Sequence, residues 1–197
     1  MRGKIGIYEN NNKNFLDYLD SLHNKILKGV LVEQAKVGYA QDTREDIKKR
    51  VTQLRWLNES VPDLYNEGLT VALNFTNKAN ADFFGFDISG VCRYIQHTEY
   101  NKGSFYDWHQ DCFLGESQEG VYERKLSFSI QLSEPDAYTG GDLEFTDDII
   151  LTPEEKERLR QRGTVIVFPS FLQHRVTEVT EGQRYALVGW REGKQWT

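Results

Sequence analysis

The sequence has few cysteines, few prolines and no long hydrophobic run. Its 197 residues include 2 Cys, 4 Pro and 1 Met. Cys92 and Cys112 fit no C-x-x-C or other zinc spacing, which argues against a zinc site and against a disulfide framework. No stretch approaches the roughly 20 apolar residues of a membrane-spanning helix, and residues 1–8 lack the apolar length of a signal peptide. These absences predict a soluble cytoplasmic protein with no membrane partner.

The chain also lacks an excess of basic residues. It has 24 Lys and Arg against 30 Asp and Glu, a formal net charge of −6. Nucleic acid is therefore not expected as a partner, because binding the phosphate backbone requires clustered Lys and Arg. Hydrophobic residues make up 39% and charged residues 27%, which is typical of a globular chain. The length is that of one domain, so we expect residues 1–197 to form a single catalytic unit.

Two helical patterns occur in the N-terminal part of the chain. Apolar residues at helical spacing predict a helix over residues 12–31, and Gly29 supplies its stop. Pro62 opens a second predicted helix that runs to about residue 80, although Gly68 weakens the pattern. Residues 52–57 are expected to form a short strand. Together, residues 1–89 are predicted to be a helical support region.

Short strand-like runs separated by turn residues dominate the rest of the chain, the pattern of a β-sandwich or barrel. A helix-start signature at Thr152-Pro153-Glu154-Glu155 interrupts them, with an N-cap hydroxyl, Pro at the first helical position and a Glu that completes a capping box. Residues 90–197 are therefore predicted to form the catalytic core. The strands are expected at residues 91–97, 105–112, 125–133, 142–147, 164–168, 173–179 and 184–191.

Four residues of this region have the side chains of an oxygen-activating iron site. On a strand, His109 and Asp111 lie at i and i+2 and share one face, so both can reach one metal ion. His174 and Arg184 follow on later predicted strands. Two His and one carboxylate leave open metal positions, as in non-heme Fe(II) oxygenases. Each residue alone has a simpler explanation as a polar surface strand, a structural histidine or a surface cation, but their order and spacing together are more specific.

A longer pattern surrounds these residues. It comprises Tyr100-x-x-Gly103-x-x-Tyr106-x-x-His109-x-Asp111, followed in order by residues 125–133, 140–143, 163–170 and 184–190. This pattern resembles the Fe(II)- and 2-oxoglutarate-dependent oxygenases of the prolyl 4-hydroxylase type, and residues 50–57 resemble the segment before the core in bacterial and viral members. The resemblance implies an α+β, mainly β fold, in which N-terminal helices pack against one sheet of a cupin-like jelly roll, the double-stranded β-helix.

The resemblance also implies roles for individual residues. His109, Asp111 and His174 match the iron ligands, and Arg184 matches the residue that pairs with the distal carboxylate of 2-oxoglutarate. A planar guanidinium suits bidentate capture of a carboxylate better than a Lys does.

Further matched positions are weaker. Ser127 and Gln131 match hydrogen-bond donors to the same carboxylate, and Tyr100 matches a cofactor-binding residue near the metal. Trp190 matches a residue of the substrate entrance. Tyr100 and Trp190 could equally be buried aromatic residues of the core. Arg50, with Thr52 and residues 113–122, is expected to shape substrate selectivity.

The remaining conspicuous residues have plainer interpretations. His23 and His97 lack any partner pattern and are expected to be non-ligands. Trp108 follows the opposite face of the strand from His109 and is expected to pack against other residues.

The implied reaction is hydroxylation of an unactivated C–H bond by a dioxygenase. Fe(II) is the cofactor, 2-oxoglutarate and O2 are co-substrates, and succinate and CO2 are released. The carboxylate of Asp111 favours hydroxylation, because related halogenases replace it. A prolyl residue in a peptide or protein is the first expected substrate. A free amino acid, a small metabolite and a need for ascorbate all stay open.

Two alternative functions share some of these features. A cupin-type metalloprotein acting as an isomerase, sensor or binding module would keep the fold and the metal, but it would not need Arg184. A nucleic-acid-demethylating oxygenase would keep the iron chemistry. The acidic charge balance counts against that function.

Overall fold

The computed structural model describes residues 4–36, 46–90, 93–112, 123–146 and 149–194. Within these ranges the chain forms a seven-stranded sheet, a four-stranded sheet and a two-stranded ribbon, and all of the strand pairs are antiparallel. The large sheet has, in spatial order, β1 (Gly6–Tyr8), β10 (Val165–Pro169), β7 (Glu123–Gln131), β13 (Arg184–Gly193), β5 (Ile95–Tyr100), β4 (Gln53–Leu57) and β2 (Glu33–Gln34).

The four-stranded sheet supplies the other wall of the fold. Its strands are, in spatial order, β3 (Arg50–Val51), β6 (Phe105–His109), β11 (His174–Val176) and β9 (Leu143–Phe145). The ribbon pairs β8 (Tyr138–Gly140) with β12 (Val179–Gly182). Side chains from both sheets line one cavity, so the two sheets enclose the interior of a double-stranded β-helix. The predicted mainly β fold class is confirmed.

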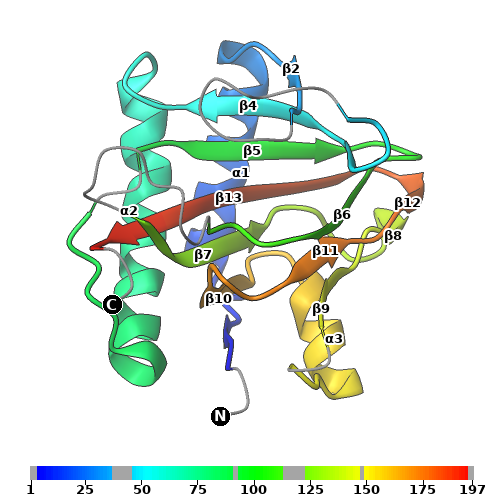
Figure 1. The fold of residues 1–197 in the computed structure, drawn as a ribbon. Helices are drawn as coiled ribbons and strands as arrows, with labels where there is room; N and C mark the ends of the chain where they lie inside the picture. The colour runs from blue at the N-terminus through cyan, green and yellow to red at the C-terminus, as the bar shows by residue number, and fades with distance from the viewer. Residues whose placement is uncertain (1–3, 37–45, 91–92, 113–122, 147–148, 195–197) are drawn as a thin grey trace.

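Two helices lie against the outer face of the large sheet (Figure 1). Helix α1 (Lys13–Gly29) begins at Asn12, whose side chain accepts a hydrogen bond from the backbone N–H of Asn14, and it buries Leu19, Leu22 and Ile26. These side chains belong to one apolar cluster with residues of α2 and of the large sheet. The predicted packing of N-terminal helices on one sheet is therefore confirmed.

Helix α2 (Pro62–Ala79) approaches the sheet closely at one residue. Gly68 is buried, and a Cβ there would lie 3.1 Å from Cδ1 of Ile95 and 3.7 Å from Cδ1 of Leu57. The glycine that weakened the helical pattern thus lets the helix pack tightly on β4 and β5. A π-helical turn, η1 (Asn80–Phe84), continues α2 at its end.

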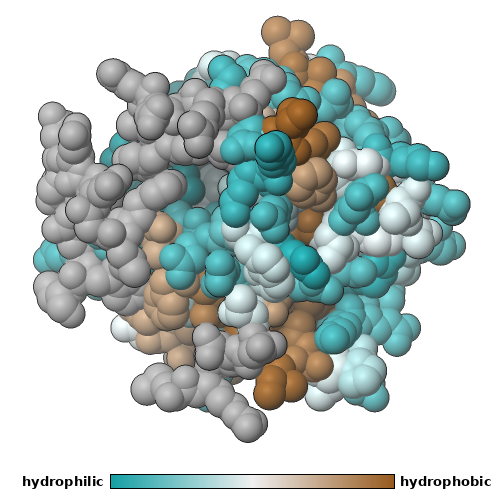
Figure 2. Space-filling model, turned by 45° about the vertical axis from the view of Figure 1, so that its right-hand side comes forward, coloured by the Kyte–Doolittle hydropathy of each residue, from teal (hydrophilic) through white to brown (hydrophobic). Residues whose placement is uncertain are grey.

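Helix α3 (Pro153–Arg160) has the predicted capping box. The Thr152 hydroxyl accepts from the backbone N–H of Glu155, and the Glu155 carboxylate accepts from that of Thr152. Leu159 is buried in a second apolar cluster, while most of the other residues of the helix are at least partly exposed. Figure 2 shows that on this side of the molecule hydrophilic residues surround smaller hydrophobic patches.

The structure differs from the expected elements in several places. The strand expected at residues 91–97 is β5, Ile95–Tyr100, and β8 was not expected. The strand expected at residues 105–112 ends at His109, and the one expected at 173–179 is divided between β11 and β12. The N-terminal region is more than a helical support, because β1, β2, β3 and β4 add strands to both sheets. In the described parts of the chain, no helix is long and apolar enough to cross a membrane.

Candidate metal centre and cavity

Two histidines and one aspartate converge at the open end of the small sheet. His109 ends β6 and pairs in register with His174, the first residue of β11. Asp111 lies beyond β6 in a bend, where its backbone N–H donates to the carbonyl of Ser170 at 2.9 Å. One potential ligand atom from each of the three side chains lies within 4.8 Å of the other two. The expected convergence is therefore present, but the bend, and not strand alternation, brings Asp111 to the histidines.

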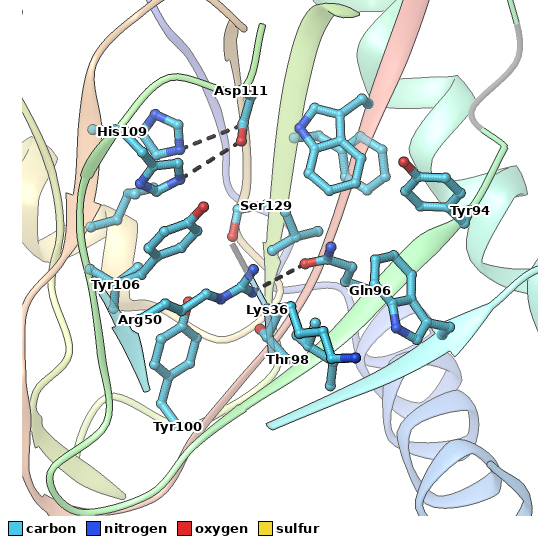
Figure 3. Close-up of a pocket in the computed structure, with 18 of the residues that line it drawn as sticks. Lys36, Arg50, Tyr94, Gln96, Thr98, Tyr100, Tyr106, His109, Asp111 and Ser129 are labelled. Atoms are coloured by element: carbon cyan, nitrogen blue, oxygen red, sulfur yellow. Dashed lines mark hydrogen bonds and ion pairs between the residues drawn. The ribbon is translucent and has the colours of Figure 1, made fainter. Parts of the chain in front are cut away.

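Both imidazoles present the same nitrogen to the carboxylate. Nδ1 of His109 lies 2.8 Å from the Asp107 carbonyl, and Nδ1 of His174 lies 2.9 Å from the Leu172 carbonyl. A carbonyl can only accept, so each Nδ1 carries the hydrogen and each Nε2 has a free lone pair. The Nε2 atoms lie 3.7 Å and 3.5 Å from the two carboxylate oxygens of Asp111. Two lone pairs and a carboxylate thus point to one site (Figure 3).

The protonation states suit a cation at this site. Burial raises the pKa of Asp111, but the nearby histidines, Arg124 and the Ser127 hydrogen bond outweigh burial and hold the pKa at about 2. Burial, and next the neighbouring His174, lowers the pKa of His109 to about 3. At neutral pH the carboxylate is therefore ionised and His109 is neutral, as metal ligation requires.

A hydroxyl group of the large sheet holds the Asp111 carboxylate. The Ser127 hydroxyl, on β7, lies 2.6 Å from Oδ2 of Asp111 and 3.0 Å from the Ser170 hydroxyl. Ser127 was expected to contact 2-oxoglutarate, but its hydroxyl is engaged with Asp111. This geometry favours a different role, in which Ser127 orients the aspartate.

Arg184 lies at the start of β13, opposite Tyr100 of β5 in the register. Its guanidinium carbon lies 5.3 Å from the centre of the Tyr100 ring, and Nη2 donates to Oε1 of Gln131 at 3.0 Å. The Gln131 amide in turn donates to the Tyr138 hydroxyl. Arg184 and Gln131 are therefore neighbours, as expected, and Gln131 fixes one side of the guanidinium. Tyr100 is buried, as a core aromatic residue would be, and it also lines the cavity, so its cofactor-binding role stays a prediction.

A cavity of about 840 Å³ connects these groups. The two candidate histidine ligands, Asp111, Arg184 and Tyr100 line it. Figure 3 shows three of them, His109, Asp111 and Tyr100. Further polar side chains line the cavity from the large sheet, namely Gln96, Thr98 and Ser129.

Aromatic side chains form one wall of the cavity. Trp56 and Tyr94 have ring centres 5.0 Å apart, and Tyr94 and Trp190 have ring centres 5.8 Å apart. Arg124 stacks on Trp190 at 3.7 Å and donates to the Tyr94 hydroxyl. Trp190 is buried and lines the cavity, and its role at a substrate entrance stays a prediction.

Arg50 enters the cavity from β3. It pairs in register with Tyr106 of β6, its guanidinium carbon lies 4.3 Å from the centre of the Tyr106 ring, and that ring stacks on His109 at 3.5 Å between centres. Burial, the largest effect, raises the pKa of Tyr106 to about 12. Arg50 therefore lies close to the metal centre, although residues 113–122, its expected companions in selectivity, lie outside the described residues.

Other residues lie where the sequence suggested or were missed. Trp108 lies outside this cavity, where Arg175 stacks on its ring at 4.8 Å, so its expected packing role is confirmed. The sequence did not indicate that Gln96 of β5, or Tyr94 just before that strand, lines the cavity. Their place becomes clear only when the neighbouring strands are known. Cys112 is buried and free.

His23 and His97, which had no visible partner in the sequence, pair with each other. Nδ1 of His23 lies 2.8 Å from Nε2 of His97, across 74 residues of sequence. Neither belongs to the candidate metal group found among the described residues. Their expected status as non-ligands agrees with this geometry.

Comparison with known proteins agrees with the site. Residues 95–192 match the family described as the 2OG-Fe(II) oxygenase superfamily. A PKHD-type hydroxylase of Parvibaculum lavamentivorans is 36% identical over 94 residues, which cover 47% of this chain and 39% of that protein. Another PKHD-type hydroxylase, from Rippkaea orientalis, is 37% identical over 95 residues, covering 48% of this chain and 40% of that protein. The matched regions thus span about two fifths of these relatives' length.

Solved structures share the fold at low sequence identity. A Pseudomonas putida prolyl-4-hydroxylase has a TM-score of 0.66 at 17% identity, covering 98% of this chain and 94% of that one. A prolyl hydroxylase from Trichoplax adhaerens, in complex with a hypoxia inducible factor peptide fragment, has a TM-score of 0.68 at 16% identity, covering 97% and 84%. A viral collagen prolyl hydroxylase from Paramecium Bursaria Chlorella virus-1, in a 2OG complex, has a TM-score of 0.65 at 16% identity, covering 96% of each chain.

Proposed function

The chain belongs, through residues 95–192, to the 2OG-Fe(II) oxygenase superfamily, and on that premise we propose that it is a dioxygenase that hydroxylates a C–H bond. Fe(II) is the proposed cofactor, and 2-oxoglutarate and O2 are the proposed co-substrates. The observation that carries the proposal is the donor set. Two Nε2 lone pairs and one ionised carboxylate converge, and both Nδ1 atoms donate to backbone carbonyls.

The donor set suits Fe(II) better than a structural zinc ion. His109, His174 and Asp111 provide nitrogen and oxygen ligands without a thiolate, and the buried Cys112 is not part of the group. Three protein ligands leave further positions for bound co-substrates. The Ser127 hydroxyl and the backbone carbonyls fix the ligand orientations before the ion binds, so metal binding requires little reorganisation.

The Arg184 end of the cavity supports a 2-oxoglutarate site. A planar guanidinium can bind a carboxylate with two parallel N–H donors. In Arg184, Nη2 also donates to Oε1 of Gln131, which fixes the orientation of the guanidinium. Arg184 and the candidate ligands line the same cavity, so one dicarboxylate could reach both. When bound, iron would allow O2, the oxidant, to take two electrons from 2-oxoglutarate, which is released as succinate and CO2, and two from the substrate C–H bond, which becomes C–OH. The chain itself positions these groups, excludes water through its aromatic wall and presents the substrate.

A prolyl residue is the substrate that we propose first. PKHD-type hydroxylases are among the relatives, and prolyl hydroxylases share the fold. The aromatic wall of Trp56, Tyr94 and Trp190 could pack against an apolar ring. We further propose that residues 1–197 work as one unit, because N-terminal strands complete both sheets around the cavity.

Anaerobic titration of the metal-free protein with Fe(II) and 2-oxoglutarate tests this function. We expect the weak visible charge-transfer band of a chelate in the wild-type protein. The band should need at least about tenfold more 2-oxoglutarate in Arg184→Gln, since a hydrogen bond to a charged group contributes about 1.5–3 kcal/mol.

The matched control is Arg162→Gln, which removes an arginine that forms ion pairs with Asp20 and Glu134 on the surface. It should leave the titration unchanged. Absence of the band from folded wild-type protein would instead favour a cupin-type metalloprotein without oxygenase activity.

A further inference from the structure

One buried arginine in the cavity lacks an anionic partner. The Arg50 side chain is buried, with only 6% of the residue exposed. Its Nη2 donates to Oε1 of Gln96 at 3.3 Å, and its Nε has no hydrogen-bond partner among the described residues. In the part of the chain that the structure describes, no carboxylate forms an ion pair with it. A buried cation without an anion is costly, so this arrangement calls for a negatively charged ligand.

A second residue that lines the cavity, Trp190, also has an unpartnered donor. The Nε1–H of Trp190 is buried and has no acceptor among the described residues. An indole N–H and a guanidinium N–H can only donate. Two unsatisfied donors in one cavity therefore suit a ligand that is rich in acceptors, such as a carboxylate.

The cavity is positively charged although the protein is acidic. Five basic side chains line it, namely Lys36, Lys49, Arg50, Arg124 and Arg184. Only two of its lining residues in the described chain are acidic, Glu33 and the candidate ligand Asp111. Because the net charge of the chain is −6, this local excess of positive charge marks the cavity as a site for anions.

The other arginines in this part of the large sheet, whether buried or partly buried, already have partners. Arg55 forms an ion pair with Glu99 at 2.7 Å, and Arg184 donates to Gln131 and is proposed to bind 2-oxoglutarate. Arg124 donates to the Tyr94 hydroxyl at 2.8 Å and stacks on Trp190. Of the two buried arginines that line the cavity among the described residues, Arg184 is assigned to 2-oxoglutarate, so Arg50 is the one left without an anion.

The neighbours of Arg50 suggest what the rest of the ligand looks like. Gln96, its hydrogen-bond partner, pairs in register with Trp56, whose ring belongs to the aromatic wall. On its other side Arg50 stacks on Tyr106, which in turn stacks on His109. A ligand whose carboxylate reaches Arg50 would thus place its apolar body between the aromatic wall and the metal centre.

We propose that Arg50, supported by Gln96, binds a carboxylate of the substrate, so that the enzyme acts on a molecule with an apolar body and a nearby free carboxylate. This inference rests on the proposed function and specifies its substrate class. The carboxylate has two sources compatible with a prolyl substrate. It is either the main-chain carboxylate of a free or C-terminal residue, or the side chain of an acidic residue beside the target.

Binding calorimetry with two matched probe pairs separates these sources. The first pair is N-acetyl-L-proline and N-acetyl-L-prolinamide. The second is acetyl-Asp-Pro-amide and acetyl-Asn-Pro-amide. Titrations are made under argon, with Fe(II) and saturating 2-oxoglutarate present, so that Arg184 is occupied. We expect one carboxylate probe to bind about 10–100-fold more tightly than its amide, the range that corresponds to a charge-assisted hydrogen bond.

The variants then test whether Arg50 is responsible. Arg50→Gln should abolish the preference for the carboxylate probe. Arg50→Lys keeps the positive charge and should keep part of the preference, and it provides the test if Arg50→Gln does not fold. Lys36→Gln removes an exposed cation from the same cavity and should leave the preference nearly unchanged.

Three results would overturn the proposal. The first is equal binding, or no binding, of the carboxylate and amide probes by the wild-type protein. The second is an equal loss of the preference for carboxylate over amide probes in Lys36→Gln and Arg50→Gln. That result would indicate that the overall positive charge of the cavity, and not Arg50, attracts the carboxylate. The third is a weakening of 2-oxoglutarate binding by Arg50→Gln as large as that by Arg184→Gln, which would assign Arg50 to the co-substrate.

A parallel titration without Fe(II) and 2-oxoglutarate keeps this test separate from the test of the proposed function. The wild-type protein could prefer the carboxylate probe through Arg50 and yet show no charge-transfer band with Fe(II) and 2-oxoglutarate. That result would support the anion site and refute the oxygenase function. A protein with the band but without the preference would refute the anion site alone.

Discussion

The four histidines of the protein form two pairs, each with one buried and one partly buried ring, that are built in different ways. His109 and His174 have ring centres 4.2 Å apart, and each Nδ1 donates to a backbone carbonyl. His23 and His97 have ring centres 5.0 Å apart, and a ring nitrogen of one hydrogen-bonds to a ring nitrogen of the other. In the first pair both Nε2 lone pairs stay available. In the second pair, one lone pair is used within the pair itself.

The carboxylates near the two pairs also differ. Asp111 lies against both Nε2 atoms of the first pair. Glu99 is close enough to His23 to affect its pKa, but its carboxylate is paired with Arg55. The comparison shows that proximity of two imidazoles does not make a metal site. The partner of each second ring nitrogen and the availability of a carboxylate decide it.

Loss of His174 should produce the largest difference between the pairs. His174→Ala removes one of three ligands, so we expect Co(II) affinity to fall by more than about 100-fold, beyond the 10–100-fold typical of residues that only support a ligand. Anaerobic calorimetry with Co(II) measures this effect. His23→Ala is the matched control and should bind Co(II) as the wild type does. Equal losses in both variants would contradict the assignment of the metal centre.

A smaller effect is expected at the hydroxyl that supports Asp111. Ser127→Ala removes the 2.6 Å hydrogen bond to Oδ2, and we expect a loss of about 10–100-fold in Co(II) affinity. Ser129→Ala, on the same strand and also facing the cavity, removes a hydroxyl that has no recorded bond to Asp111 and is the control. Unchanged affinity in Ser127→Ala would show that Asp111 is oriented by the backbone alone.

The second pair should affect stability and not metal binding. Burial, then the neighbouring His23 and Arg55, lowers the pKa of His97 from 6.5 to about 3. Tyr185 and Glu99 complete its titratable surroundings. Below pH 6.5 the His97 ring binds a proton in the unfolded chain but not in the folded one. The free energy of unfolding therefore falls as the pH drops toward 3. The slope for one group is up to about 1.4 kcal/mol per pH unit.

Urea denaturation of the metal-free protein at a series of pH values between 7 and 4 measures this slope. His97→Gln removes the titrating ring and should reduce the slope relative to the wild type, because the proton uptake by the unfolded chain at this position is lost. Parallel curves for the two proteins would contradict the claim that His97 stays neutral when buried. His109 titrates in both proteins and therefore cancels from the difference.

The two pairs also show how far the sequence could predict the structure. The motif around His109 and Asp111 and the later His174 predicted the first pair, because their order follows a pattern shared with known oxygenases. The second pair had no such signal, because His23 lies on a helix and His97 on a strand 74 residues away. Contacts of this kind depend on how α1 crosses the sheet, which local patterns do not specify.

The same limit applies to other elements of the fold. The strands around residues 125–133, 164–168 and 184–191 were found because apolar and polar residues alternate or because the run is uniformly apolar. The two-residue strand β3 was missed, since so short a segment is ordered by pairing with β6 and not by its own composition. The hydrogen bond from Ser127 to Asp111 was missed for a related reason. It depends on the bend after His109.

Substitution of Arg55 should have the smallest effect, a change in the pKa of His23. It also makes the His23–His97 pair resemble the His109–His174 pair, because an unpaired carboxylate then lies nearby. Arg55→Gln removes a charge that lowers the pKa of His23 and His97 and breaks the ion pair of Glu99, so we expect the pKa of His23 to rise. Titration of the imidazole protons by NMR measures the shift. Arg175→Gln, which breaks a more exposed pair with Glu144, is the control and should leave the His23 pKa unchanged.

The Arg55→Gln variant also separates the two conditions for a metal site. It supplies a free carboxylate beside two imidazoles but leaves the hydrogen bond between His23 and His97 in place. If free lone pairs on both rings are required, Co(II) affinity should match that of the wild type. A new Co(II) site in Arg55→Gln would show that an available carboxylate is sufficient, and the difference between the two pairs would then rest on Arg55 alone.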